Sequence, residues 1–298
     1  MKKHMTLASV LLLLAILAAG CQKDALLKEE LSDKASLEFR TAAPDFDLYV
    51  LNPKTGETMQ LSHIPNCGEF DPSFSHDTRF VAHDAFFDPE HHIYVTDVQT
   101  KESKLLPGAE GGNDPSWSPN GKWIVFTKTS EDGGVRIYRI YWEGGIAEPV
   151  TDGCRADWSP DNKMIVFERN GIYTRNLETG EEKYLCPGSA PVWSPDGTTI
   201  AYCRAGQLFL IPVDETGAPT GASVQLTNCT DPVGKPSWSS NSKMIAFFSG
   251  NETDSYDIWR VRVEDGVMEN LTNTPDFNEI DPDWSPNGRV IVFSKGSI

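Results

Sequence analysis

The stretch Asp114-Pro115-Ser116-Trp117-Ser118-Pro119-Asn120-Gly121, followed by Trp123-Ile124-Val125-Phe126, decides the fold of this chain because related copies of it recur along the sequence. Each copy has one anchor aromatic, and the six anchors are Phe74, Trp117, Trp158, Trp193, Trp238 and Trp284. Successive anchors are 43, 41, 35, 45 and 46 residues apart, a period that favours one four-stranded β-propeller blade per copy over a helical or short solenoid unit. The fixed place of these aromatics predicts that they pack within or between blades rather than stack on sugars.

The residues around each anchor predict the strands of a blade. Ser-Pro-Asp/Asn-Gly favours a type I turn, in which proline presets φ and the last residue adopts the left-handed conformation that closes a hairpin. Matching apolar side chains follow two residues apart, as in Ile165/Phe167 and Ile245/Phe247, which is typical of a strand with one buried face. An aliphatic-aromatic pair such as Ile93-Tyr94 then opens a third strand, and a short fourth strand follows. We therefore expect strands A to D in each repeat, with A before the turn and B after it.

The two ends of the repetitive region are complementary. Residues 46–62 contain a C-D hairpin without its A and B strands, and residues 281–294 contain an A-B hairpin without its C and D strands. Together they would complete a sixth blade, and a ring closed in this way leaves no exposed sheet edge. The sequence predicts an all-β, six-bladed propeller with four-stranded antiparallel blades.

The Trp-Ser-Pro-Asp-Gly repeat and its spacing resemble the repeat of TolB-like propellers, a WD40-like family also described as PD40. The resemblance covers residues 46–298 and implies a module that binds a partner. TolB itself has an additional N-terminal α/β domain, and residues 22–45 are too short to supply it. A role that depends on that domain is therefore not expected.

The N-terminus has the pattern of an export signal. Residues 1–20 combine a basic start, an apolar run and small residues before Cys21, which resembles the lipobox of a bacterial lipoprotein. The resemblance implies a lipidated Cys21, a flexible tether over residues 21–45, and attachment to the outer membrane on its periplasmic or cell-surface side. An ordinary secreted protein is the alternative, because Ala18 replaces the leucine preferred in lipoboxes.

Charge and cysteine content limit the possible partners. The formal net charge of −17 repels nucleic acid and favours basic proteins, cationic ligands or divalent cations, although it also suits a soluble secreted surface. Besides Cys21, the chain has five cysteines, which could form at most two disulfides: Cys67, Cys154, Cys186, Cys203 and Cys229. No Cys-x-x-Cys pair is present, so the sequence supports neither a zinc ribbon nor a thioredoxin-like motif.

Antiparallel strands place the A-B and C-D turns on one face of the disc and the B-C and D-A loops on the other. Irregular loops on a rigid scaffold are where binding residues usually lie, so we expect the B-C/D-A face to dock a partner. The B-C loops of blades 1, 2 and 5 are predicted to be long, and those of blades 3 and 4 short. The long loops are acidic and would form an uneven rim that contains Asp84, Asp88, Glu90, Glu131, Asp132, Glu252, Asp254 and Asp257.

The position three residues before each anchor should lie near the mouth of the central channel. In blade order it is occupied by Asp71, Asp114, Arg155, Ala190, Lys235 and Asp281. One interpretation is that aspartate before proline caps its own turn. The other is that the charged members, Asp71, Asp114, Arg155, Lys235 and Asp281, form a ring that binds a charged segment of a partner.

Blade 1 contains a dense group of residues suited to a transition metal: His83, Asp84, Asp88, Glu90, His91 and His92. Neighbouring residues of an exposed loop rarely all face one ion, so no cofactor is expected. A bound divalent cation is the one alternative. This group motivates the alternative of a metal-assisted polysaccharide lyase or a sugar-binding propeller.

Motifs of the common enzyme classes are missing from the sequence, which has no Gly-x-Ser-x-Gly, P-loop, GxGxxG or HExxH. We therefore expect a non-catalytic, monomeric propeller of the bacterial cell envelope that binds an envelope protein or peptide, with a basic partner favoured by charge.

Overall fold

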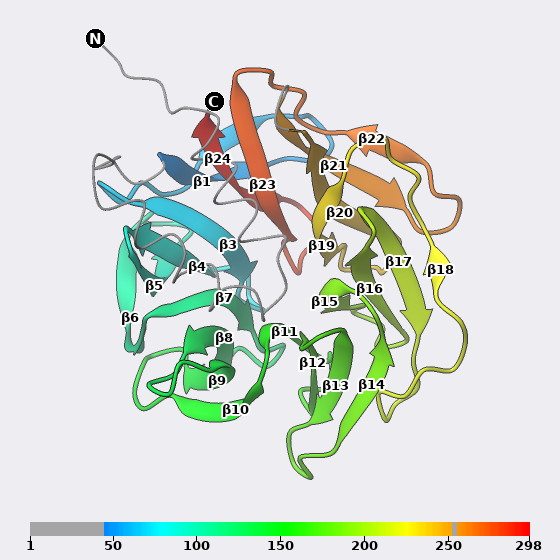
Figure 1. Cartoon of the computed structure of the whole chain (residues 1–298). Helices are drawn as coiled ribbons and strands as arrows, with labels where there is room; N and C mark the ends of the chain where they lie inside the picture. Colours follow the sequence, from blue (N-terminus) through cyan, green and yellow to red (C-terminus); the bar gives the residue numbers. More distant parts are fainter. Residues whose placement is uncertain (1–44, 252–254) are drawn as a thin grey trace, which may run out of the picture.

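The computed structural model describes residues 45–251 and 255–298, which form six four-stranded antiparallel sheets arranged around a common centre (Figure 1). The prediction of an all-β, six-bladed propeller is confirmed. These two ranges contain no α-helix, and therefore none long and apolar enough to cross a bilayer. The predicted signal peptide, Cys21 and most of the tether lie outside the described residues.

The strands occupy four concentric positions in the blades. The innermost A strands are β3 (Gly68–Phe74), β7 (Gly112–Trp117), β11 (Cys154–Trp158), β15 (Ser189–Trp193), β19 (Val233–Trp238) and β23 (Phe277–Trp284). The B strands are β4 (Phe80–Phe87), β8 (Trp123–Thr129), β12 (Met164–Glu168), β16 (Thr199–Arg204), β20 (Met244–Gly250) and β24 (Ile291–Ser297). The C strands are β5 (Glu90–Asp97), β9 (Val135–Tyr141), β13 (Ile172–Asn176), β17 (Gln207–Pro212), β21 (Tyr256–Arg262) and β1 (Phe46–Leu51). The outermost D strands are β6 (Ser103–Glu110), β10 (Glu148–Asp152), β14 (Glu182–Cys186), β18 (Val224–Gln225), β22 (Met268–Asn270) and β2 (Thr58–Gln60).

Blade 6 is built from both ends of the described chain, as predicted. Its strand order is β2-β1-β24-β23, and β1 pairs antiparallel with β24 from Phe46 opposite Gly296 to Leu51 opposite Ile291. In Figure 1 the blue β1 lies beside the red β24. The last blade therefore holds the ring closed through a full ladder of backbone hydrogen bonds.

The core lies between consecutive blades. All six anchor aromatics are 5–8% exposed, which confirms that they pack in the interior. Trp158 of blade 3, for example, belongs to one buried cluster with Val125 of blade 2. The indole N–H of Trp158 also donates to the carbonyl oxygen of Ser116 in blade 2 at 3.2 Å. The anchors thus pack each blade against the one before it, and in blades 3 and 5 the indole N–H also donates across that contact.

The Ser-Pro-Asp/Asn-Gly segments form the predicted turns. Gly121 has a φ of 70°, and its N–H donates to the Ser118 carbonyl at 2.8 Å. The Ser118 hydroxyl accepts a hydrogen bond from the Trp123 N–H at 2.9 Å. In blade 3, where glycine is missing, Asn162 takes the left-handed conformation with a φ of 63°, which asparagine tolerates better than most residues.

The prediction of a long B-C loop over residues 84–92 in blade 1 is wrong. β4 continues to Phe87 and β5 starts at Glu90, so only Asp88 and Pro89 connect them. The extended hairpin hides residues that a loop would expose, and both His83 and Asp84 are buried.

Four of the cysteines are free thiols in the described part of the chain: Cys67, Cys186, Cys203 and Cys229. Burial raises the pKa of Cys67 and of Cys203 to about 12, which makes both thiols poor nucleophiles.

Candidate functional site

The six positions three residues before the anchors converge at the centre of the disc. We call Asp71, Asp114, Arg155, Ala190, Lys235 and Asp281 the mouth ring. All six line one cavity of about 210 Å³ between the innermost strands. The structure therefore brings together every channel-mouth residue named from the sequence.

A bulge in each innermost strand turns these side chains toward the channel. The pairing of strand A with strand B shifts register in all six blades between the residue before the mouth-ring position and the residue two after it, for example between Phe70 and Ser73. Every mouth-ring residue has a positive φ of 44–53°, although none is glycine. Side chains of a regular strand would point to the two blade faces. The bulge and the left-handed residue aim them at the channel instead, at a conformational cost of about 1 kcal/mol or more each.

Proline follows the mouth-ring residue in five blades and alanine in one: Pro72, Pro115, Ala156, Pro191, Pro236 and Pro282. Strand A is the free edge of its sheet, and proline has no N–H that would be left without a partner there. The Asp-Pro pattern thus reflects a bulge at a sheet edge. The partners of Asp71 and Asp114 lie across the channel, so the geometry differs from that of an aspartate that caps its own turn.

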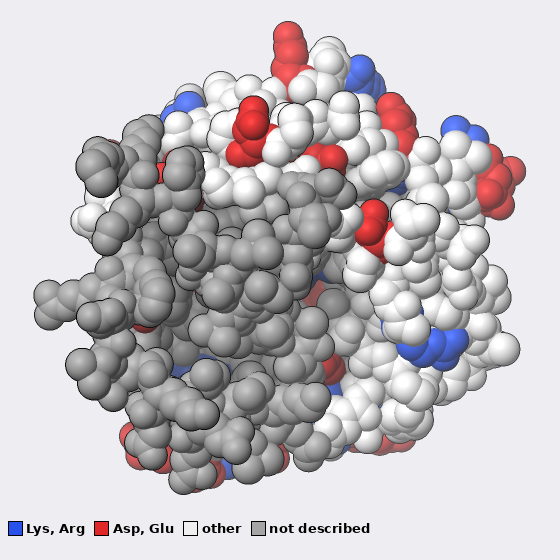
Figure 2. Space-filling view, turned by 45° about the horizontal axis from the view of Figure 1, so that its top comes forward, with Lys and Arg blue, Asp and Glu red and all other residues white. Residues whose placement is uncertain are grey.

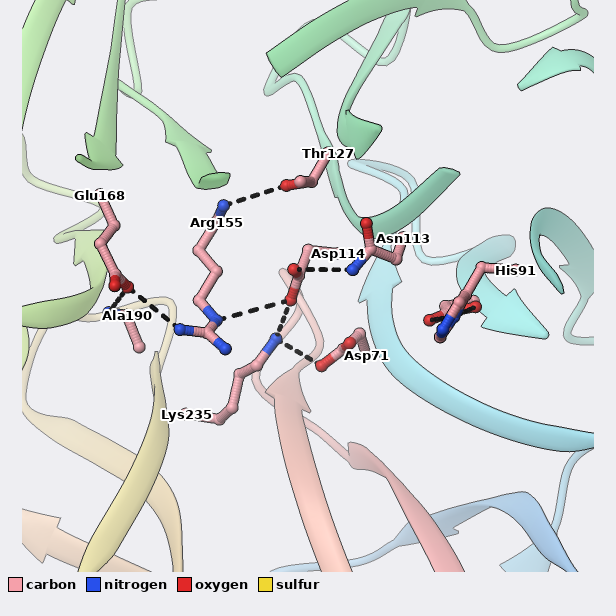
Figure 3. Close-up of polar contacts among 10 residues, drawn as sticks. Asp71, His91, Asn113, Asp114, Thr127, Arg155, Glu168, Ala190 and Lys235 are labelled. Carbon is pink, nitrogen blue, oxygen red and sulfur yellow. Dashed lines mark hydrogen bonds and ion pairs between the residues drawn. The ribbon is translucent and has the colours of Figure 1, made fainter. Parts of the chain in front are cut away.

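Ion pairs connect the mouth ring across the cavity (Figure 3). The Lys235 ammonium contacts carboxylate oxygens of Asp71 and of Asp114, the latter at 2.6 Å. The Arg155 guanidinium lies 4.0 Å from Asp114 and 3.1 Å from Glu168. Two bases thus face acids supplied by several blades.

Burial and these charges set the pKa values of the ring. Burial opposes ionisation of Asp114, but the charges of Lys235 and Arg155 outweigh it and hold its pKa at about 2. Burial also disfavours a charged Lys235, yet Asp114 and Asp71 raise its pKa above the ordinary lysine value. Asp281 differs, because burial and then the charge of Asp71 raise its pKa well above that of an ordinary aspartate.

Sequence reasoning missed a second ring two residues further along each innermost strand. We call Ser73, Ser116, Asp157, Val192, Ser237 and Asp283 the clasp ring. Four of its side chains join neighbouring blades by accepting a hydrogen bond from the backbone N–H of the next anchor. Trp117 donates to Ser73 at 3.1 Å, Trp193 to Asp157 at 2.8 Å, Trp284 to Ser237 at 2.8 Å, and Phe74 to Asp283 at 2.8 Å. The regular spacing of Ser or Asp one residue before the anchor was the available signal.

Two serine–aspartate pairs of the clasp ring, which we call clasps, lie on opposite sides of the ring. The Ser116 hydroxyl donates to Asp157 at 3.0 Å, and the Ser237 hydroxyl donates to Asp283 at 2.9 Å. Burial raises the pKa of Asp157 to about 6 and that of Asp283 to about 7, although their backbone hydrogen bonds oppose the shift. The Asp283 clasp links blades 5, 6 and 1, across the junction of the two chain ends.

The six metal-type residues of blade 1 do not converge. His91 pairs with Asp84 at 2.8 Å on one face of the hairpin, while His83 bonds to Thr96 at 2.9 Å and His92 lies 3.5 Å from Glu90. Strand alternation sends adjacent residues to opposite faces. No group of three potential metal ligands occurs among residues 45–251 and 255–298. In the described part of the chain, the glycan-lyase alternative therefore has no metal-binding cluster to support it.

The predicted acidic rim is also partly neutralised. Besides the Asp84 pair, Asp132 lies 2.6 Å from Arg136, and Asp257 accepts hydrogen bonds from Asn270 at 2.9 Å and from the Thr274 N–H at 3.0 Å. Glu252 and Asp254 lie outside the described residues. On the described surface in Figure 2, acidic side chains are dispersed among basic ones rather than gathered in one patch.

Sequence comparison relates the chain to known proteins. The TolB β-propeller domain family, PD40, matches residues 33–219, more than half of the chain. An uncharacterised protein of Agrobacterium fabrum is 30% identical over 199 residues, which cover 58% of this chain and 65% of that protein. An uncharacterised peptidase of Bacillus subtilis is 27% identical over 209 residues, which cover 63% of this chain and only 30% of the peptidase.

Solved structures share the fold. A protein of Agrobacterium tumefaciens described as TolB superposes with a TM-score of 0.70 at 19% identity, covering 86% of this chain and 99% of that chain. An oligogalacturonate lyase of Vibrio parahaemolyticus superposes with a TM-score of 0.51 at 12% identity, covering 86% and 98%. At such identities the superpositions establish the architecture alone. The family match over residues 33–219 also establishes the evolutionary relationship: this chain belongs to the TolB β-propeller domain family.

Proposed function

We propose that this protein is a binding propeller of the bacterial cell envelope, and that its channel mouth receives a charged segment of a partner protein. The observation that carries the proposal is the mouth ring. Six residues, one per blade, have a left-handed backbone conformation and lie at the bulge where pairing between strands A and B is interrupted. This conformation directs their side chains into one cavity. Backbone strain that recurs at a cavity is typical of a functional site.

The polar chemistry of the cavity suits binding. Its carboxylate, ammonium and guanidinium groups can exchange their internal partners for those of a ligand, and proline-lined walls give the site a rigid frame. Charged side chains that pair with one another in the mouth also discriminate among ligands, because a ligand must replace the contacts that it breaks.

The cellular location is part of the proposal. The signal-like residues 1–20 and Cys21 support export and lipid attachment at the outer membrane, and the TolB-type propeller is compatible with a partner there. Metabolic labelling with a radioactive fatty acid should mark the wild type and not a Cys21→Ser variant. Label that persists in the variant would contradict lipidation at Cys21.

The binding role is tested by capture of partners from the envelope of the native bacterium. Asp71, Asp114 and Asp281 are replaced together by Asn, and the matched control replaces Glu57, Glu215 and Glu264 by Gln. These three glutamates are exposed and lie in C-D turns on the other face of the disc. We expect the mouth variant to lose a partner that the control keeps.

A second variant blocks the mouth without removing its charges. Ala190→Arg should be compatible with the backbone, because Arg155 already adopts a φ of 50° at the corresponding position, close to the 47° of Ala190. We expect the added side chain to fill the cavity and to prevent capture. A partner retained by both folded mouth variants would overturn the proposal.

A further inference from the structure

Asp281 is the one mouth-ring acid that has no ion pair within the described part of the chain. It lies on β23, is 1% exposed and lines the central cavity. Neither of its carboxylate oxygens has a hydrogen-bond partner at normal distance and angle, and the Asp71 backbone N–H lowers its pKa only slightly. Asp71 and Asp114, by contrast, both contact the Lys235 ammonium.

An unpartnered buried carboxylate is unfavourable, because it has lost its hydration and gained nothing in return. The groups that face Asp281 explain why the chain cannot satisfy it. Asp71 on β3 and Asp114 on β7 repel its negative charge, and the one nearby ammonium, on Lys235 of β19, is already held by these two acids. Asp281 could therefore accept a hydrogen bond from one more positively charged donor in the cavity.

The contacts of Lys235 show which kind of cation fits. Its ammonium lies between two mouth-ring carboxylates, so the ring accommodates a compact cation that donates in several directions. Asp281 and Asp71 lie on adjacent blades and offer a second pair of this kind. A planar guanidinium is suited to a bidentate carboxylate, a different geometry from that of an ammonium between two acids, and Arg155 pairs through Nη1 with an acid outside the ring, Glu168, at 3.1 Å.

We infer that Asp281, together with Asp71, binds the ammonium group of a lysine side chain that a partner protein inserts into the channel mouth. This inference rests on the proposed function and specifies its chemistry. The inserted ammonium would supply Asp281 with the donor that the chain lacks, and Lys235 would keep Asp114.

Binding of this kind must be coupled to a proton. Burial and Asp71 keep the Asp281 carboxyl protonated above the pH range of ordinary aspartates, whereas an ammonium requires the carboxylate. Lysine binding should therefore release a proton and should strengthen as the pH rises toward the pKa of Asp281.

The test uses purified protein and the probe Nα-acetyl-lysine N-methylamide, followed by calorimetry in two buffers with different heats of ionisation. We expect binding with net proton release. The norleucine analogue, which lacks the ammonium, should not bind, and the arginine analogue should bind more weakly. Equal binding of the norleucine or arginine analogue, or lysine binding without proton release, would overturn the inference.

Substitution of Asp281 tests whether this residue is the one that binds the lysine probe. Asp281→Asn keeps the shape of the side chain, and asparagine tolerates the left-handed φ of 53° at this position. We expect it to weaken lysine binding by about tenfold or more and to abolish the proton release, as for the loss of a charge-assisted hydrogen bond. Glu215→Gln, which removes an exposed charge on the opposite face, should bind like the wild type. Unchanged binding by a folded Asp281→Asn protein would contradict the inference.

The two proposals fail in different ways. If envelope capture depends on the mouth ring while the lysine probe does not bind, the binding role stands and the lysine chemistry is wrong. If neither result is obtained, the proposed function fails as well.

Discussion

The mouth ring and the clasp ring lie on the same six innermost strands, only two residues apart. Their side chains nevertheless have different partners. Mouth-ring side chains enter the channel, where charged groups of both signs and an alanine all fit. Clasp-ring residues also line the cavity, but five of the six are serine or aspartate, and their side chains hydrogen-bond to the neighbouring blade. The bulge between the two positions separates them.

This difference teaches how one strand can serve both recognition and assembly. A clasp residue is constrained by the backbone N–H that it must satisfy, whereas a mouth residue is constrained by its left-handed φ and by the charges that share the cavity. Substitutions in the clasp ring should therefore act through lost hydrogen bonds, and those in the mouth ring through charge balance. Four experiments can break or sharpen this distinction.

The largest effect is expected for Lys235→Met. Removal of the ammonium leaves Asp71 and Asp114 buried together without their shared partner, which should lower the free energy of unfolding by about 3 kcal/mol. Denaturant unfolding near neutral pH measures the loss. Replacing both aspartates by Asn in the same background should restore most of it, and a failure to restore it would show that packing rather than charge balance is responsible.

A loss of about 2 kcal/mol is expected for Asp283→Ala, because the Phe74 N–H and the Ser237 hydroxyl lose a partly buried acceptor. Asp157→Ala removes the equivalent acceptor on the opposite side of the ring and should cost a similar amount. Thermal and urea unfolding compare the two. A much smaller loss for either variant would mean that its clasp does not hold the blades together.

The clasps should also make stability depend on pH. The folded pKa values of about 6 for Asp157 and about 7 for Asp283 lie above that of an unfolded aspartate, near 4. The folded state therefore binds these protons more tightly, so the stabilisation is complete below about pH 4 and is lost as the pH rises through 6 and 7.

We expect the Asp157→Asn/Asp283→Asn protein to lose about 1 kcal/mol less stability than the wild type between about pH 6.5 and pH 8. Melting temperatures across that range measure the difference. Glu69, with a pKa of about 7, and Asp84, with one of about 6, remain in both proteins and contribute a common background. Parallel pH profiles would contradict titration of the clasps.

The smallest effect is expected for Asp281→Asn. Because the Asp281 carboxyl has no ion pair or side-chain hydrogen bond to lose, its neutral isostere should change the free energy of unfolding by less than about 0.5 kcal/mol, or raise it. Urea unfolding alongside Asp283→Ala provides the comparison within one strand. A loss as large as that of Asp283→Ala would erase the distinction between the two rings.

Much of the fold was predictable from the sequence, because its signals are local and repeat. The turn after each anchor, the alternating apolar faces and the complementary ends each depend on residues a few positions apart. The blade 1 loop was predicted wrongly for a related reason. The polar residues Glu90, His91 and His92 suggested a loop. They instead belong to β5, which pairs with β4, and His83 and Asp84 of β4 are buried.

The candidate site was predictable in position but not in its contacts. Counting three residues back from each anchor was enough to name the mouth ring. That Lys235 holds Asp71 and Asp114 while Asp281 is left alone depends on the way side chains from four blades share one cavity. The clasps at Asp157 and Asp283 were missed, because each of their partners is 36 or more residues away along the chain.

The repeat by itself determined the propeller, its blade count and the closure of its ring, since turn chemistry and strand periodicity are properties of short segments. Only the tertiary structure decided which charges of the mouth ring are neutralised and which acid stays available. Ion pairing and burial depend on distances across the channel, and closure of the ring sets those distances.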